Sequence, residues 1–184
     1  MSFVININSE EAAVKPSVIF GSEKAPVGTY KVKLSYLAVS RTGGPDEVTG
    51  EQRPYIYNLK CLLSHADKAA GARYKSLNYN LDILGTKQIV TKKGEAMTID
   101  FKSNLARFLR DIGFDSAAIT GDITLTASED AFKALSSEDS WKGTATDILV
   151  NGQSVLEYAK GVVLNAAVKP GKKEGTTFVA GVFI

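Results

Sequence analysis

Residues 28–40 read Gly-Thr-Tyr-Lys-Val-Lys-Leu-Ser-Tyr-Leu-Ala-Val-Ser, and the rest of the predicted fold is built outward from this stretch. Every second residue from Tyr30 to Tyr36 is apolar or aromatic, whereas Lys31 and Lys33 lie on the opposite face of an extended chain. This alternation predicts a strand, because a helix would scatter the same residues around its axis. The pattern slips by one residue after Tyr36, which predicts a β-bulge. Long bent first strands are typical of small barrels, because such a strand pairs at both of its ends.

The composition is that of a globular chain with no strong charge bias. The 184 residues are 44% hydrophobic with a formal net charge of +2, which predicts one domain over residues 26–184 after an N-terminal extension at 1–25. The single cysteine, Cys61, excludes an internal disulfide and fits a cytoplasmic protein. No apolar run approaches the roughly 20 residues of a membrane helix, so we expect no membrane partner.

Two more strands follow the first and are separated by polar connections. Residues 55–63 are dense in aromatic and apolar side chains, and residues 73–84 alternate apolar with Asn and Asp. The segment 41–53 is rich in Gly, Pro, Asp and Thr, which indicates a long loop, and 65–71 is a second polar connection. The pattern predicts a three-stranded antiparallel meander.

The period then changes to that of a helix. Apolar residues at 101–113 recur at helical spacing. Gly113 is at the position just after the predicted helix, where glycine is common. A second helical turn is expected from Ser128. Trp141 lies in the turn-rich segment that follows, where a packing role is favoured over base stacking.

The last part of the sequence returns to strands. Residues 146–150 lead into Asn151-Gly152, a strong hairpin signal. The segment 153–168 is expected to be a long strand that bends near Gly161, and 176–184 closes the chain as a strand.

Three strands, a helix and two or more strands follow one another in the order of the OB-fold, a five-stranded antiparallel barrel with its helix between strands three and four. The predicted class is therefore mainly β with one or two helices (α+β). The chain resembles phage-encoded OB-fold single-stranded DNA-binding proteins over about residues 26–184. The resemblance rests on Pro-Val-Gly-Thr-Tyr-Lys-Val-Lys at 26–33, the helix at 101–113, Gly-Val-Val-Leu-Asn-Ala at 161–166 and Lys-Lys-Glu-Gly-Thr-Thr-Phe-Val at 172–179.

This resemblance implies a protein that coats single-stranded DNA, without sequence preference, during phage replication or recombination. It implies replication or recombination proteins as further partners and leaves the oligomeric state open, a homo-oligomer included. Many such proteins end in an acidic tail that recruits partners, and this sequence departs from them because residues 178–184 are Phe-Val-Ala-Gly-Val-Phe-Ile.

A single-strand binder needs basic groups for phosphates and ring faces for bases. In an OB barrel these line strands two and three and the loops joining strands one to two and four to five. The basic and aromatic residues that fall there, or on the polar face of the first strand, are Lys31, Lys33, Tyr55, Tyr57, Lys60, Arg73, Tyr74, Lys75, Lys169, Lys172, Lys173 and Phe178. The alternative is that the tyrosines are half-buried core residues and the turn lysines are only solvated.

Enzyme chemistry is not expected. Cys61 and His65 are four residues apart at the end of a strand, and a buried small hydrophobe is the favoured interpretation of Cys61. One His and one Cys cannot form a thiolate or imidazole zinc site, and the carboxylates lack calcium-loop spacing, so we expect neither metal nor cofactor. The alternative function is a structural or assembly protein, such as a virion or tail component, with no nucleic-acid binding.

Overall fold

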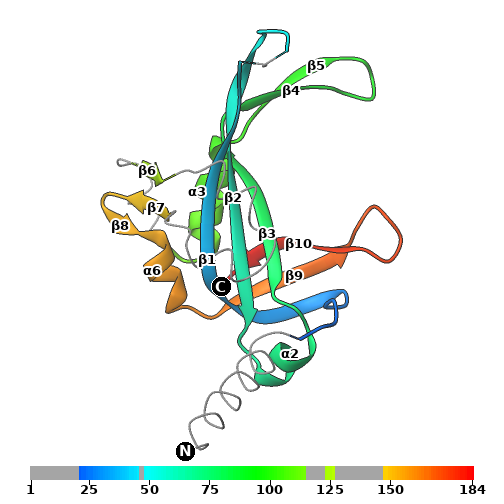
Figure 1. Cartoon of the computed structure of the whole chain (residues 1–184), viewed down its shortest axis with the longest axis vertical. Helices are drawn as coiled ribbons and strands as arrows, with labels where there is room; N and C mark the ends of the chain where they lie inside the picture. The colour runs from blue at the N-terminus through cyan, green and yellow to red at the C-terminus, as the bar shows by residue number, and fades with distance from the viewer. Residues whose placement is uncertain (1–20, 46–47, 115–122, 127–146) are drawn as a thin grey trace, which may run out of the picture.

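The computed structural model describes residues 21–45, 48–114, 123–126 and 147–184 (Figure 1). Most of the expected N-terminal extension, the helical turn expected from Ser128, and Trp141 lie outside these residues.

The described residues form ten strands and three helices. In chain order the elements are β1 (Gly28–Pro45), β2 (Gln52–His65), α2 (Lys68–Arg73), β3 (Leu77–Leu84), β4 (Thr86–Val90), β5 (Ala96–Asp100), α3 (Lys102–Asp111), β6 (Ile123–Thr126), β7 (Asp147–Val150), β8 (Gln153–Ser154), α6 (Val155–Lys160), β9 (Leu164–Pro170) and β10 (Thr177–Phe183). The prediction of a mainly β chain is confirmed, with three helices where one or two were expected.

The main sheet has five antiparallel strands in the order β10-β9-β1-β2-β3. The first strand pairs at both ends, as predicted: residues 28–32 pair with β9, and residues 32–45 pair with β2. Val32 lies at the change of partner and is fully buried. The register shifts between Leu34 and Tyr36, within two residues of the predicted bulge.

The sheet curls so that its two outer strands, β10 and β3, approach each other. In the described part of the chain no ladder of hydrogen bonds joins these two strands, so the sheet is not a closed barrel. Helix α3 contacts both β3 and β10 on the inner side of the curl. The ring of Phe108 stacks on that of Tyr79 with centroids 6.2 Å apart, and Leu105 and Leu109 are fully buried beside it. This apolar face anchors the helix that the sequence predicted.

The prediction of a long loop at 41–53 is wrong. Strand β1 continues to Pro45 and β2 begins at Gln52, so the two strands extend as a long hairpin (Figure 1). Gly43 and Gly44 have φ values of 95° and 93°, and the register shifts between Thr42 and Gly44. The two glycines therefore mark a bulge within the paired strands. The Gly-rich composition of this segment had predicted a loop, because glycine is common in both loops and bulges.

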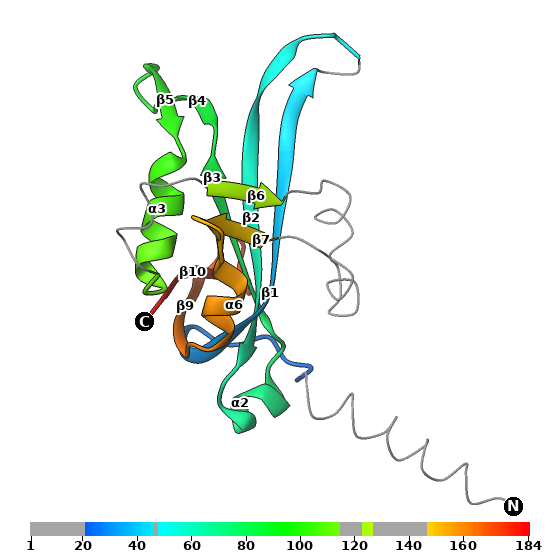
Figure 2. The same ribbon diagram turned by 90° about the vertical axis from the view of Figure 1, so that its left-hand side faces the viewer.

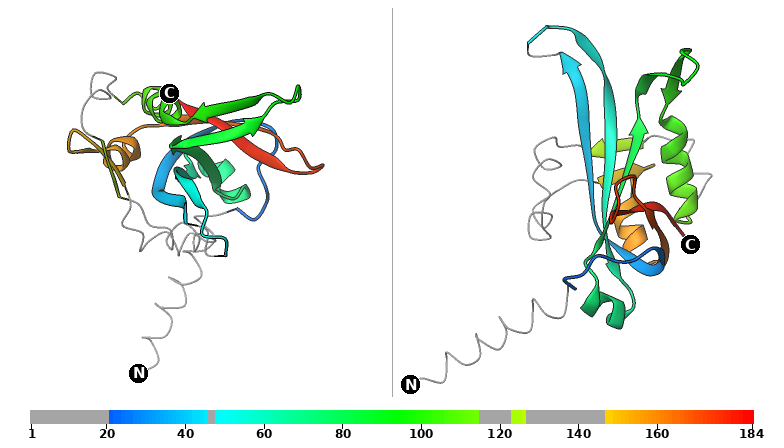
Figure 3. Two further views of the ribbon diagram at one scale, coloured as in Figure 1. Left: turned by 90° about the horizontal axis from the view of Figure 1, so that it is seen from above. Right: turned by 90° about the vertical axis from the view of Figure 1, so that its right-hand side faces the viewer.

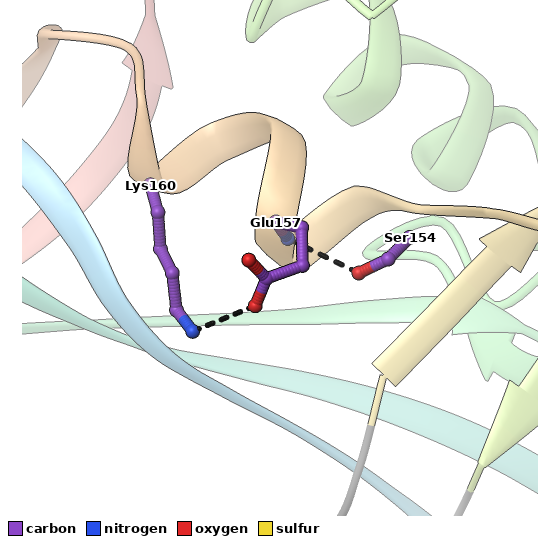
Figure 4. A network of polar contacts seen from close by, with 3 residues as sticks. All are labelled: Ser154, Glu157 and Lys160. Atoms are coloured by element: carbon purple, nitrogen blue, oxygen red, sulfur yellow. Dashed lines mark hydrogen bonds and ion pairs between the residues drawn. The ribbon is translucent and has the colours of Figure 1, made fainter.

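The expected strand at 153–168 is also wrong, because α6 interrupts it. Ser154 begins this helix by accepting a hydrogen bond from the Glu157 backbone N–H at 3.1 Å (Figure 4). The Lys160 ammonium lies 2.9 Å from a Glu157 carboxylate oxygen. Val155 and Ala159, four residues apart, are fully buried. Helix α6 packs against β1 and β7 on one side of the main sheet (Figure 2).

Two further details of the connections follow from local chemistry. The predicted hairpin at Asn151-Gly152 is confirmed: both residues have positive φ, 50° and 78°, as a type I′ turn requires. The polar connection at 65–71 contains the start of α2, whose first turn is capped by Asp67 accepting from the Ala69 N–H. This six-residue helix buries no side chain, and its residues therefore show no apolar period from which it could be predicted.

Candidate nucleic-acid interface

The hairpin of β9 and β10 presents a basic and aromatic surface. Lys169 and Phe178 are direct cross-strand partners, and both are exposed, Phe178 by 52%. Lys172 and Lys173 are exposed in the connecting turn. Backbone bonds fix that turn, with the Gly171 N–H donating to the Thr176 carbonyl at 2.7 Å and the Thr176 N–H donating to the Lys173 carbonyl at 3.1 Å. Three ammonium groups and one ring face are therefore held on a single hairpin.

The lysines of β1 continue this surface along the outer side of the sheet. Lys31 and Lys33 are exposed and alternate with the buried Val32 and Leu34, as predicted. Lys31 lies opposite Asn165, and because alternate residues of a strand share a face, Lys169 lies on the same side of β9 as Asn165. We call Lys31, Lys33, Lys169, Lys172, Lys173 and Phe178 the basic strip.

The residues expected on β2 divide between two faces. Tyr57 is half-buried and packs against the main core. Tyr55 is 44% exposed, and its ring lies over Gly44, where an added Cβ would come within 2.9 Å of the ring. Lys60 is half-buried on the outer face opposite Ala38 and Asn80, and burial lowers the pKa of its ammonium group. Lys60 thus lies on the outer face, Tyr57 belongs to the core, and Tyr55 is exposed at the end of β2 that the core does not cover.

Arg73 ends α2, and Tyr74 and Lys75 follow it, at the end of β2 away from the β1–β2 turn. The Arg73 Nε lies 3.1 Å from a Glu23 carboxylate oxygen, and this hydrogen bond raises the pKa of the guanidinium, with charge attraction adding to it. The guanidinium also lies over the Tyr74 ring, 5.3 Å from its centroid. The Tyr74 ring packs edge-on against Tyr30 at 5.9 Å. Arg73 and Tyr74 therefore serve a local cluster, in which the Arg73 side chain stays 64% exposed, and Lys75 is exposed as well.

The sequence interpretation missed the β4–β5 hairpin, which stands between β3 and α3. Its exposed basic residues are Lys87 in β4 and Lys92 and Lys93 in the turn. The signal was present as two short segments with β-branched residues around Lys-Lys-Gly at 92–94, a composition that fits a hairpin turn. This hairpin projects to the same side of the molecule as the β9–β10 hairpin (Figure 1 and the left view of Figure 3).

The residues weighed for enzyme chemistry lie in a packed region. The Cys61 side chain is buried between its strand partners Leu37 and Tyr79, and burial raises the pKa of its thiol. The His65 Nε2 lies 3.1 Å from the Lys75 carbonyl oxygen, and its Nδ1 is buried with no partner in the described part of the chain. A thiol whose pKa is raised is a poor nucleophile at neutral pH.

Within the described residues, no three His, Cys, Asp or Glu side chains gather where they would hold a metal ion. None of the helices in this part of the chain combines the length and apolar character needed to cross a membrane.

Comparisons of the chain with family models, with curated proteins and with solved structures found no match. Its function therefore has to be inferred from the residues themselves and their geometry.

Proposed function

We propose that this protein binds single-stranded DNA without sequence preference through an OB-fold, and that it acts in phage DNA replication or recombination. The proposed mechanism has two parts. Lysines of the basic strip neutralise phosphates, and Phe178 and Tyr55 offer ring faces to bases. No catalytic step is involved.

The order of elements supports the OB assignment. In an OB-fold the first strand pairs with both the second and the fourth, and the helix lies between the third and fourth. Here β1 pairs with β2 and β9, and α3 precedes β9 and packs beneath the curled sheet. The open contact between β3 and β10 fits the partly open barrel that this fold allows.

The observation that carries the functional proposal is the Lys169–Phe178 pair beside the Lys172–Lys173 turn. An exposed ring next to three ammonium groups offers stacking and charge neutralisation within one hairpin. Stacking tolerates any base, because every base has a π-face, and phosphates carry no sequence information. Under the proposed OB assignment, this hairpin corresponds to the loop between the last two strands, which contributes to ligand binding in that fold.

A fluorescence titration with oligo-dT at two salt concentrations tests the proposal. Neutralisation of three phosphates by Lys169, Lys172 and Lys173 predicts that log K falls with log salt with a slope of at least about −2, using about −0.7 per phosphate for single strands. A bovine serum albumin control reports non-specific quenching. Absence of binding at low salt would refute the proposal.

One observation favours the structural or assembly function as a second candidate. Phe183 and Ile184 are 40% and 65% exposed, beside the exposed Val163 that precedes β9. Apolar side chains gathered at one end of a strand pair are typical of protein interfaces. Size-exclusion chromatography with light scattering separates the two functions, because a large homo-oligomer that is indifferent to oligo-dT would favour this candidate.

A further inference from the structure

The β4–β5 hairpin is an arm that is ordered by its own backbone hydrogen bonds and adds no fully buried side chain to the core. Its base is closed by the pairing of Thr86 with Asp100 and by the Phe101 N–H donating to the Gly85 carbonyl at 3.0 Å. Its turn is held by the Thr91 N–H donating to the Glu95 carbonyl at 2.9 Å. None of the side chains in β4 or β5 is fully buried. Because this hairpin is held by its own backbone hydrogen bonds and its side chains are exposed or half-buried, those side chains can contact a ligand.

The tip of this arm has the same chemistry as the tip of the β9–β10 hairpin. Lys92 and Lys93 are exposed and form no ion pair with any carboxylate in the described part of the chain. The same holds for Lys172 and Lys173. Each turn closes on a positive-φ glycine with open space around it, Gly94 in one and Gly175 in the other. Each tip has two lysines and one adjacent glutamate, so its formal net charge is +1.

The two arms leave the sheet on the same side. Figure 1 and the left view of Figure 3 both show the β4–β5 and β9–β10 hairpins projecting in the same direction, with β3 near the base of the upper one. Strand β3 presents Asn78 and Asn80 on its outer face, and both are exposed. Both tips therefore carry exposed ammonium groups on one side of the molecule, and the outer face of β3 carries exposed amide groups.

We propose that the β4–β5 hairpin is a second phosphate-binding arm, which holds the same nucleic-acid strand as the β9–β10 hairpin so that the strand passes across β3. This proposal rests on the proposed function and adds a second contact region to it. The ligand of the tip is the phosphodiester backbone, because each of the two exposed ammonium groups, which form no ion pair in the described part of the chain, can neutralise one phosphate. The tip has no ring with which to read or stack a base.

The test compares K92A/K93A with a control that removes the same charge elsewhere, K68A/R110A. Lys68 and Arg110 are exposed on α2 and at the end of α3, away from both tips. Binding of the full chain to fluorescein-labelled oligo-dT of about 30 nucleotides is measured by anisotropy across a salt series. Loss of two phosphate contacts predicts that the slope of log K against log salt concentration becomes smaller in magnitude by about 1.4. If the affinities of variant and unmodified protein converge at about 1 M salt, the variant binds about 65-fold more weakly at about 50 mM salt and about tenfold more weakly at about 200 mM. The control variant is expected to lose less than threefold.

The outcomes separate this proposal from the one on which it rests. If the unmodified protein binds and K92A/K93A matches K68A/R110A, the second arm is refuted and the proposed function stands. If the unmodified protein does not bind at low salt, the proposed function itself fails. A K92A/K93A variant that binds normally but changes its mass in light scattering would assign the arm to contact with a second copy of the chain instead. K92Q/K93Q, which keeps side-chain length, repeats the test if the alanine variant fails to fold.

Discussion

Replacement of Phe178 by alanine separates base stacking from a structural role of the same ring. Phe178 is 52% exposed, so alanine removes only about half of the burial of a phenylalanine side chain, or about 1 kcal/mol of stability. Stacking of a base on the ring contributes about 1–3 kcal/mol to binding, which converts to a loss of about 5- to 150-fold in affinity for oligo-dT. We therefore expect a large binding defect together with a small stability defect.

The matched control is Phe183→Ala, in the same strand. Phe183 is 40% exposed and lies opposite Asn165, near the end of β10 away from the lysine turn. Its replacement is expected to cost a similar amount of stability. Affinity for oligo-dT should stay within about twofold of the unmodified protein, because the proposed path of the nucleic acid runs past the lysine turn and not past Phe183. Anisotropy titration and urea unfolding measure the two quantities. Equal affinity of Phe178→Ala and unmodified protein refutes the stacking argument, and equal losses in both variants would assign the effect to a general apolar surface.

Three further predictions concern stability. Phe108→Ala should lower the free energy of unfolding by about 3–5 kcal/mol, because it empties the contact between α3 and Tyr79; a loss below about 1 kcal/mol in urea unfolding would contradict that packing. Gly85→Ala should lower Tm far more than Gly94→Ala. Both glycines have positive φ, but only at Gly85 would a Cβ meet a backbone oxygen, at 2.2 Å, so equal Tm losses would be inconsistent with the geometry. Burial raises the pKa of the Cys61 thiol above its ordinary 9.0, so as pH rises the thiol loses its proton in the unfolded chain before it does in the folded one. The free energy of unfolding therefore falls as pH rises above about 9, by up to about 1.4 kcal/mol per pH unit. Cys61→Ala should show a shallower fall between about pH 8 and about pH 10, and an unchanged slope would exclude this thiol as its source.

The long central strand and the main helix could be predicted because each has one face that must be buried. In β1, Lys31 and Lys33 alternate with buried apolar residues, and this alternation indicated which face of the strand is buried and which is exposed. In α3 the apolar stripe that ends near Gly113 recorded the side that faces the sheet. Burial on one face leaves a period in the sequence, and a period can be recognised without knowledge of the partner.

The missed elements lack such a period. The β4–β5 hairpin has side chains exposed or half-exposed on both faces, so its residues do not alternate. Helix α6 has six residues, too few to repeat its Val155–Ala159 spacing, and it stands within a strongly β-forming segment. The candidate site residues Lys92 and Lys93 were missed for the same reason, because the tip of a hairpin can be located only after the hairpin is recognised.

The inward packing of Tyr57 shows a different limit. The sequence placed Tyr55 and Tyr57 on the same face of β2, since they are two residues apart. The structure leaves Tyr55 44% exposed and packs Tyr57 against the core. The core covers β2 only from about Tyr57 onward, because β1 and β2 extend beyond it as a hairpin. Which face of a strand is inward can be read from its pattern, but where the core ends along the strand depends on the length of its neighbours.

The contrast between the curled sheet and its hairpins bears on how binding and stability are divided. The sheet buries its inner face completely over Val32, Leu59 and Ile83, and this burial supplies the energy of folding. The β4–β5 arm buries no side chain fully, so substitutions at its tip change little of that energy. Ligand contacts placed on such arms can therefore vary without cost to the fold. If tip variants lowered both affinity and Tm together, this separation would be wrong, and the arm would have to be counted as part of the folding unit.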